Sequence, residues 1–495
     1  MKLEKKSLRE AEEWKKAGYE LPEYDLDIIQ ANTKKKPTWI HFGAGNIFRA
    51  FMAVAQQKLL NEKISDTGII VCEGYDSEII EKVYRKYDNL TIAVSMKQNG
   101  SMDKMVVGSV AESLLLKPET SDWLRLKEIF ENPALQMATF TITEKGYQIK
   151  NASGYLPQIK EDMQVGPEQA KSYMGCLTAL CYLRYLAGKL PLALVSMDNF
   201  SHNGDRLKMA VLTIAEVWEK NNLVEEGFSG YLQDETKISF PWSMIDKITP
   251  RPDSKIKEML ERTGLEGMDI FTTSANTYIA PFVNAEETEY LVIENNFPNG
   301  RPKLEHAGIL FADRRTVECV EQMKVCTCLN PLHTGLAIFG CLLSYTSISK
   351  EMEDPLLREL AVQIGQEGMP VVVHPGILEP KQFLHEVLYV RLPNPYIPDT
   401  PQRIATDTSQ KLSIRYGETI KAYQKTGKSL EQLRAIPLVI AGWIRYLTGV
   451  DDFGNAMELS PDPRMTELRE KISDIAEKPE MVAGSILADA SVFGQ

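Results

Sequence analysis

Two glycines, Gly43 and Gly45, form the first segment of this 495-residue chain whose spacing suggests a chemical role. They follow a short apolar strand candidate at 38–42 and precede a helical pattern at 47–60. A glycine turn there lets the backbone approach a diphosphate, and the helix N-terminus adds free N–H groups. Phe48 stands where the fingerprint would have its third glycine, so an unrelated tight turn remains an alternative.

An acid after the next strand candidate, 68–72, strengthens the dinucleotide interpretation. Glu73 ends that strand, where a carboxylate accepts hydrogen bonds from a ribose diol and repels a 2′-phosphate. No basic residue follows before Lys82, which favours NAD over NADP, and Asp76 is the competing acid. A solvated loop carboxylate is the alternative for both. The predicted cofactor-binding residues are Gly43, Gly45, Asn46, Ile47 and Glu73.

Four later segments set polar groups beside apolar strand or helix patterns. Each alone is compatible with ordinary turns and caps, because Ser, Thr, Asn and Asp favour such positions. Their order in a chain that already carries a glycine turn is more specific. The segments are 141–147, 196–204, 245–250 and 324–334.

The elements that must position these residues change in kind along the chain. Up to about residue 300, apolar strand candidates at 90–94, 137–143 and 192–196 alternate with helical stretches, which indicates a mostly parallel α/β sheet. Turn residues at 297–302 mark a boundary, and helical patterns dominate beyond it. We therefore expect a Rossmann-type dinucleotide-binding domain at 1–300 and a mostly α-helical domain at 301–495.

The ordered motifs resemble those of the polyol-specific long-chain dehydrogenase/reductase family, the mannitol dehydrogenase family. The resemblance covers most of the chain, from about Trp39 to Lys411. It rests on G-x-G-N-x-x-R (43–49), T-E-K-G-Y (143–147), D-N-x-x-H-N-G (198–204), D-x-I-T-P (246–250), L-N-x-x-H (329–333), R-x-x-N-P (391–395) and R-I-x-x-D-x-S-x-K (403–411).

The resemblance implies metal-independent, NAD(P)-dependent interconversion of a secondary alcohol and a ketone on an acyclic sugar derivative. It makes Lys324 the general acid/base, and it places Asn199 and Asn330 on the reacting oxygen. These roles suit the chemistry, because amide donors stabilise a developing oxyanion and a lysine with a lowered pKa can supply the proton. His333 would polarise the carbonyl. Asp246 and Arg391 would bind substrate, Arg391 by clamping a carboxylate.

One spacing departs from the family pattern. The family has K-x4-N-x2-H, whereas this chain has one more residue between Lys324 and Asn330. On one unbroken helix, at about 100° per residue, Lys324 and His333 would lie on opposite faces. We expect Asn330 to be an N-cap with Pro331 as the first helical residue, and the extra residue to form a bulge after Lys324.

Composition excludes other classes of function. The formal net charge of −12 argues against broad nucleic-acid binding, and no apolar run approaches the ~20 residues of a membrane span. Seven scattered cysteines and an N-terminus without an apolar leader favour a cytoplasmic protein with reduced thiols. Cys326 and Cys328 diverge on a helix, so no metal site is predicted.

The combined prediction is an NAD-dependent oxidoreductase of the hexuronate branch, acting on D-mannonate and D-fructuronate. A mannitol or arabinitol 2-dehydrogenase acting on neutral polyols is the alternative within the class. A catalytically inactive NAD-binding sensor is the alternative outside it, motivated by the altered spacing. The resembled family includes monomers, which favours a monomer here.

Overall fold

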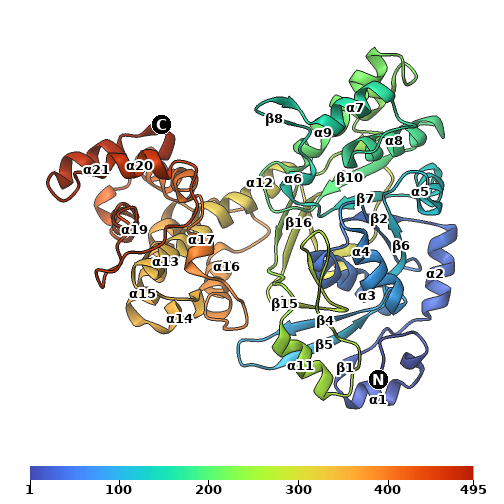
Figure 1. Ribbon diagram of the computed structural model, residues 1–495, viewed down its shortest axis with the longest axis horizontal. Coiled ribbons are helices and arrows are strands. Elements are labelled where there is room, and N and C mark those ends of the chain that lie inside the picture. The colour runs from blue at the N-terminus through green and yellow to red at the C-terminus, as the bar shows by residue number, and fades with distance from the viewer. Residues whose placement is uncertain (494–495) are drawn as a thin grey trace. The chain divides into compact units, whose positions relative to one another are not determined.

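A computed structural model describes residues 1–493, which divide into two compact units (Figure 1). The first unit holds residues 1–96 and 101–317. The second holds residues 97–100 and the chain from Glu318 onward. Each unit has its own architecture and is described by itself.

The centre of the first unit is a six-stranded sheet in which every neighbouring pair is parallel. The chain leaves β2 toward β3 on one side and returns to β7 on the other, so β2 lies at the switch point where such sheets bind ligands. The order is β11 (Ile238–Ser239), β10 (Leu192–Ser196), β7 (Met137–Phe140), β2 (Trp39–Phe42), β3 (Ile69–Glu73) and β6 (Val110–Leu115).

Apart from β6 at the edge, the strands of this sheet are buried along their whole length, as in parallel sheets covered by helices on both faces. Ile40 and Phe42 belong to the core that includes Leu177 and Trp218, whereas Trp39 belongs to the core that includes Leu59. Helices on the two faces are α5 (Ser121–Glu131), α8 (Tyr173–Leu186) and α9 (Asn203–Lys220), and α3 (Ala53–Asn61).

The predicted strand at 90–94 exists but lies in a different sheet. As β4 (Thr91–Met96), it pairs antiparallel with β5 (Met102–Val107) and parallel with β15 (Phe282–Glu286). Its burial alternates, which is typical of a sheet with one covered face. A further sheet joins β12 (Ser243–Asp246), β16 (Tyr290–Glu294) and β17 (Leu310–Ala312). The helical pattern expected beyond residue 302 is interrupted by β17, and the first long helix begins only at Arg314.

The second unit is helical and is built around α13 (Asn330–Leu342). A continuous helical run at 314–342 is long and apolar enough to span a membrane, but 72% of its apolar window is buried, as in a core helix. Gly335 lets Ile364 of a neighbouring helix approach closely. The other main helices are α14 (Ile348–Glu353), α15 (Pro355–Gly368), α16 (Pro380–Glu386), α17 (Pro401–Ile404), α18 (Glu418–Lys425), α19 (Ala435–Tyr446), α20 (Met465–Lys471), α21 (Pro479–Leu487) and α22 (Ala490–Phe493).

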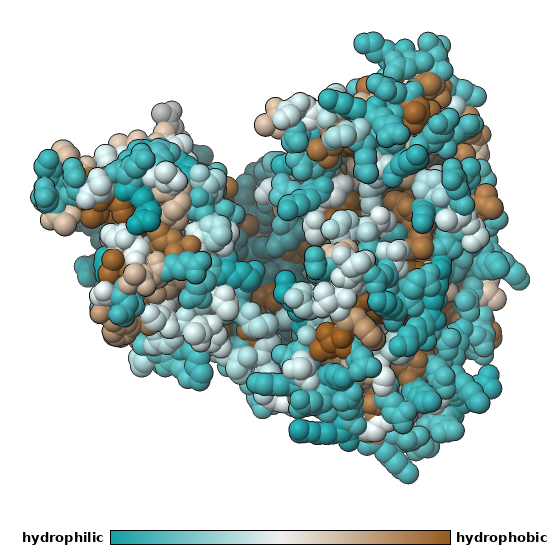
Figure 2. Space-filling model, viewed as in Figure 1, coloured by the Kyte–Doolittle hydropathy of each residue, from teal (hydrophilic) through white to brown (hydrophobic). Residues whose placement is uncertain are grey.

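Hydrophilic residues predominate on the face drawn in Figure 2, and the hydrophobic ones are scattered. Single exposed apolar side chains, such as Leu356 and Phe453, are normal for a folded protein.

Candidate active site

The glycine turn after β2 has the geometry of a dinucleotide cradle. Gly43 adopts φ +107°, and a side chain there would overlap the backbone of Thr141. A Cβ added at Gly45 meets no atom within 4 Å, so the backbone is open on that side. The helix that follows starts with half-buried Asn46 and Ile47. The residues present therefore fit a diphosphate held by backbone N–H groups.

Glu73 lies directly beneath this turn. Its Oε2 accepts the backbone N–H of Ala44 at 2.9 Å, and its Oε1 accepts that of Tyr75 at 2.7 Å. Asp76, the competing acid, is 3% exposed and accepts the Thr273 hydroxyl at 2.6 Å and the Glu78 N–H at 3.2 Å. Asp76 is therefore a capping residue, whereas Glu73 joins the loops after β2 and β3.

Residues around the glycine turn also make contacts that stabilise the fold. The Asn46 side chain donates to the Pro250 carbonyl at 3.2 Å and accepts from Arg49 at 2.9 Å. Phe48, in place of a third glycine, stacks on His41 with ring centroids 4.3 Å apart. Burial lowers the pKa of His41 to about 3, and both its ring nitrogens contact threonine hydroxyls. The prediction of His41 as a packed core residue is confirmed.

The loop after β10 carries Asn199, and Asp198 fixes that loop. The Asp198 carboxylate accepts the backbone N–H groups of Ile142 at 2.9 Å and Thr143 at 3.0 Å, and the Tyr147 hydroxyl at 2.7 Å. Asp198 thereby joins the ends of β7 and β10, and Asn199 follows it as an exposed residue.

Asp246 ends β12, whose first residue reaches the same edge of the sheet. The Ser243 hydroxyl donates to the Ser196 carbonyl at 2.6 Å, which ties β12 to the end of β10. Asp246 itself is 5% exposed. His202, singled out with this motif, adopts φ 54° and stacks on Trp242 at 4.2 Å.

In the second unit, Lys324 starts a five-residue π-turn, η6 (Lys324–Cys328). The Leu329 N–H donates a hydrogen bond to the Lys324 carbonyl at 3.1 Å. This bond joins residues five apart, so the turn holds one more residue than an α-helical turn. The expected bulge is therefore present. With one residue absorbed, Lys324 and His333 differ by about 80° instead of about 180° around the helix. The lysine is 2% exposed.

Asn330 and His333 both lie in the first turn of α13. The expected N-cap was wrong by one position: Leu329 is the N-cap, and Asn330 is the first helical residue. The reason is that the helical run continues through the π-turn without an extended residue before Pro331.

His333 has an acidic partner and two cationic neighbours. Its Nε2 lies 3.0 Å from Oδ2 of Asp399. Burial lowers the pKa of His333, Asp399 raises it, and the charges of Arg391 and Arg415 lower it further. Arg391 ends the π-turn η8 (Val387–Arg391) and is 5% exposed. The unit thus brings His333 and Arg391 together.

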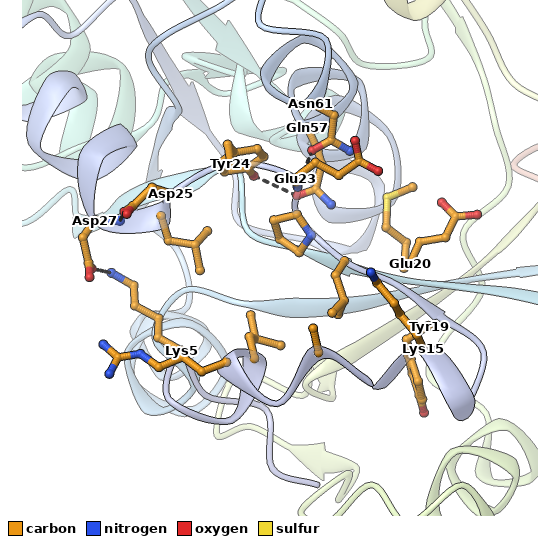
Figure 3. Close-up of a pocket in the computed structure, with 17 residues that line it drawn as sticks. Lys5, Lys15, Tyr19, Glu20, Glu23, Tyr24, Asp25, Asp27, Gln57 and Asn61 are labelled. Carbon is orange, nitrogen blue, oxygen red and sulfur yellow. Dashed lines mark hydrogen bonds and ion pairs between the residues drawn. The ribbon is translucent and has the colours of Figure 1, made fainter. Parts of the chain in front are cut away.

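A groove of about 580 Å³ lies elsewhere, along the N-terminal segment of the first unit (Figure 3). Some of its polar side chains are paired with one another: Lys5 Nζ donates to Asp27 at 2.8 Å, and the Tyr24 hydroxyl donates to Gln57 at 2.9 Å. We assign no ligand to this groove. Among residues 1–493, no three His, Cys, Asp or Glu side chains are placed to hold a metal ion.

Two family models cover nearly all of the chain. The mannitol dehydrogenase Rossmann domain matches residues 37–306, and the mannitol dehydrogenase C-terminal domain matches residues 316–495. The chain belongs to the mannitol dehydrogenase family. The predicted resemblance, the Rossmann and helical fold classes and the assignment to the dehydrogenases are thereby confirmed.

Relatives in this family match the chain over nearly all of its length. A Thermotoga maritima protein named D-mannonate oxidoreductase is 55% identical over 479 residues, which are 96% of this chain and 88% of the relative. The solved structure of Pseudomonas fluorescens mannitol 2-dehydrogenase with NAD and D-mannitol matches this chain with 27% sequence identity and a TM-score of 0.71. The match covers 100% of this chain and 93% of the mannitol 2-dehydrogenase chain. A substrate-free D-sorbitol dehydrogenase, 24% identical with a TM-score of 0.79 and 97% coverage of both chains, has the same fold.

Two residues near His333 were missed in the sequence of this family member. In sequence, Asp399 favours a cap or an ion pair, and its ion pair with Arg403 confirms this, but its contact with His333 was not predicted. Arg415 lies beyond the family motifs quoted above, and nothing in its sequence context marks it. Its guanidinium donates to the Thr334 hydroxyl, one residue after His333.

Proposed function

We propose that this protein interconverts D-mannonate and D-fructuronate with NAD as its cofactor. The observation that carries the proposal is the 55% identity, over 96% of the chain, to a relative named D-mannonate oxidoreductase. The match extends over 479 of the 495 residues and therefore spans both domains.

The charges around His333 support an acidic substrate. Arg391 and Arg415 both lie close enough to lower the pKa of His333. Arginine binds carboxylates in two-pronged geometry, and two such cations favour a sugar acid over a neutral polyol. We assign Arg391 to the substrate carboxylate and Asp246 to a substrate hydroxyl.

The first unit supplies the cofactor residues. Gly43 forms the turn, since its N–H donates to the Cys72 carbonyl at 2.8 Å. Gly45, Asn46 and Ile47 present backbone N–H groups to the diphosphate, and Glu73 accepts from the ribose while disfavouring a 2′-phosphate. When bound, NAD accepts or supplies the hydride at one carbon of the substrate.

The remaining steps belong to side chains. Lys324 removes the proton from the alcohol during oxidation and returns it to the oxygen during reduction. The amides of Asn199 and Asn330 donate to the oxygen that becomes negative, and His333 polarises the carbonyl. We assign cofactor binding to residues 1–300, and substrate binding with acid/base chemistry mainly to 301–495.

A substrate comparison tests the proposal. We expect the purified enzyme to oxidise D-mannonate with NAD at least 100-fold more efficiently (kcat/KM) than D-mannitol or D-arabinitol. Equal or better efficiency with D-mannitol would assign the enzyme to the neutral polyols. Binding of NADH without turnover of any of the three would favour the inactive sensor.

We also propose a cytoplasmic location and small-molecule substrates as the partners. All seven cysteines, which lie in the described part of the chain, are free thiols. Reduced thiols are typical of proteins kept in a reducing compartment.

A further inference from the structure

The imidazole of His333 faces a buried carboxylate outside the family motifs. Nε2 of His333 lies 3.0 Å from Oδ2 of Asp399, and the Asp399 side chain is 6% exposed. The other edge of the ring carries Nδ1. A histidine whose one nitrogen faces a buried carboxylate has its tautomer fixed by that carboxylate.

Hydrogen bonds fix both the backbone and the side chain of Asp399. Its backbone N–H donates to the Ile397 carbonyl at 2.8 Å, and its own carbonyl accepts the Ile348 N–H at 3.0 Å. Its Oδ1 accepts Arg403 Nε at 2.8 Å, with a second bond from Nη2 of the same guanidinium. One carboxylate oxygen therefore belongs to Arg403, and the other remains directed at His333.

Burial and neighbouring charges act on the pKa of Asp399 in opposite directions. Burial would raise the pKa of Asp399, but the His333 contact and the Arg403 charge outweigh it and lower that pKa. Asp399 therefore stays ionised beside the imidazole. The other charged groups that act on His333 are Arg391 and Arg415. Behind Asp399 lies buried Glu351, and burial raises the pKa of that carboxyl to about 9.

We propose that Asp399 is the positioning residue for His333, accepting its Nε2–H and leaving Nδ1 for the substrate oxygen. This inference rests on the proposed function only in placing the substrate at Nδ1. With neutral imidazole, Nδ1 accepts a hydrogen bond from the alcohol. With imidazolium, Nδ1–H donates to the ketone oxygen, and the Asp399 charge stabilises that form. No covalent bond is made or broken by either residue.

The tautomer is measured directly by ¹⁵N NMR of histidine-labelled protein. The chain has six histidines, and the His333→Gln variant identifies the signal of His333. We expect Nε2 protonated and Nδ1 unprotonated in neutral His333. A neutral His333 protonated on Nδ1 would overturn the inference, and this outcome does not depend on any turnover.

Kinetics test the same point in the active enzyme. In Asp399→Asn the amide replaces the charge at equal size, so we expect kcat for ketone reduction to fall 10- to 100-fold with little change in KM. For alcohol oxidation, in which neutral His333 accepts, the acid limb of the pH profile should move to lower pH, because the group that raises the pKa of His333 is gone. Asp399→Glu should recover part of the loss.

Asp451→Asn is the matched control, since Asp451 is also a buried aspartate of the second unit but accepts backbone N–H groups of Phe453 and Asn455. We expect an unchanged pH profile in this control. An Asp399→Asn enzyme with wild-type kcat and pH profile would overturn the inference. Absence of turnover in the wild type would remove the proposed function and leave the NMR result to decide the role of Asp399.

Discussion

At the scale of single residues, the account depends first on Lys324. Replacing it by Ala removes the proposed acid/base, and general acid/base catalysis contributes about 10²- to 10⁴-fold. We therefore expect kcat of Lys324→Ala to fall by about that factor, with NADH binding retained, in an assay of NADH absorbance. Lys350→Ala is the control, because Lys350 is 61% exposed and pairs with Glu353 on the surface. A variant at position 324 that turns over at the wild-type rate would show that another group moves the proton.

Glu73 makes a second prediction at this scale. Glu73→Gln places an amide where backbone N–H groups now donate, and it removes the charge that repels a 2′-phosphate. We expect NADH to bind about 10-fold more weakly, which is about 1.4 kcal/mol, and the preference for NADH over NADPH to shrink. Fluorescence titration of both cofactors measures this.

Asp76→Asn serves as the comparison for Glu73, because the Asp76 carboxylate is used by Thr273 and Glu78. It should leave the preference between the two cofactors unchanged. If Asp76→Asn alters that preference more than Glu73→Gln does, the ribose acid has been assigned to the wrong residue.

Some residue-level features could be predicted from the sequence and others could not. Gly43 follows from its position after a strand, since only glycine fits φ +107° at such a turn. The role of Asp399 could not be predicted, because its partner His333 is distant in sequence and the contact depends on tertiary packing. The sequence favours Glu73 over the competing Asp76 because Glu73 ends a strand, whereas their different hydrogen-bond partners are seen only in the structure.

At the scale of elements, the π-turn η6 explains how the chain tolerates its longer spacing. Deleting Cys326, inside the turn, should restore ordinary i→i+4 bonds and leave Lys324 and His333 in the same relative phase. We expect the deletion variant to fold, by circular dichroism, and to retain kcat within about 10-fold.

Deletion of Gln363 from α15 is the contrasting variant. This helix has no π-turn, so losing one residue rotates buried Leu357 and Ala361 by about 100° relative to Ile364. We expect that protein to be destabilised or unfolded. A folded Cys326-deletion variant with kcat reduced more than 100-fold would contradict the proposed phase compensation.

The packing of α14 on α13 gives a prediction on stability. Gly340 leaves room for Glu351, whose two carboxylate oxygens have no hydrogen-bond partner among the described residues. Burial raises the pKa of Glu351 to about 9, so the folded state keeps a proton that the unfolded chain releases above about pH 4.5. The free energy of unfolding should therefore fall as pH rises from about 4.5 toward 9.

Glu351→Gln removes that titration. At pH 8 we expect a higher Tm than that of the wild type and a free energy of unfolding that is larger by on the order of a few kcal/mol. Both differences should shrink at pH 5. Thermal unfolding followed by circular dichroism measures both. A stability difference that is the same at the two pH values would contradict a protonated Glu351.

Element prediction succeeded where periodicity was strong. The strands β2, β3, β7 and β10 are continuous apolar runs and were placed to within a few residues. The sheet to which β4 belongs was not predictable, because its partners β5 and β15 are far apart in sequence. The predicted single helix at 402–426 is instead several short helical pieces, interrupted near Asp407, which adopts φ 54°.

For the whole molecule, the fold class could be predicted because the sequence pattern changes from alternating strands and helices to helices alone. We propose that the enzyme is a monomer, so light scattering after size-exclusion chromatography should give a mass near 55.8 kDa. A stable mass of twice that value or more would contradict this assignment.

The central claim is hydride transfer between NADH and the ketone carbon of a hexuronate. The most direct measurement is the reaction of D-fructuronate with NADH carrying deuterium at C4 of the nicotinamide ring, followed by NMR of the product. The account predicts D-mannonate with one deuterium on the carbon that was the ketone, and one NADH consumed per product. Two results would contradict it. One is that no NADH is consumed, and the other is that the product lacks deuterium at that carbon whichever of the two C4 hydrogens was replaced by deuterium.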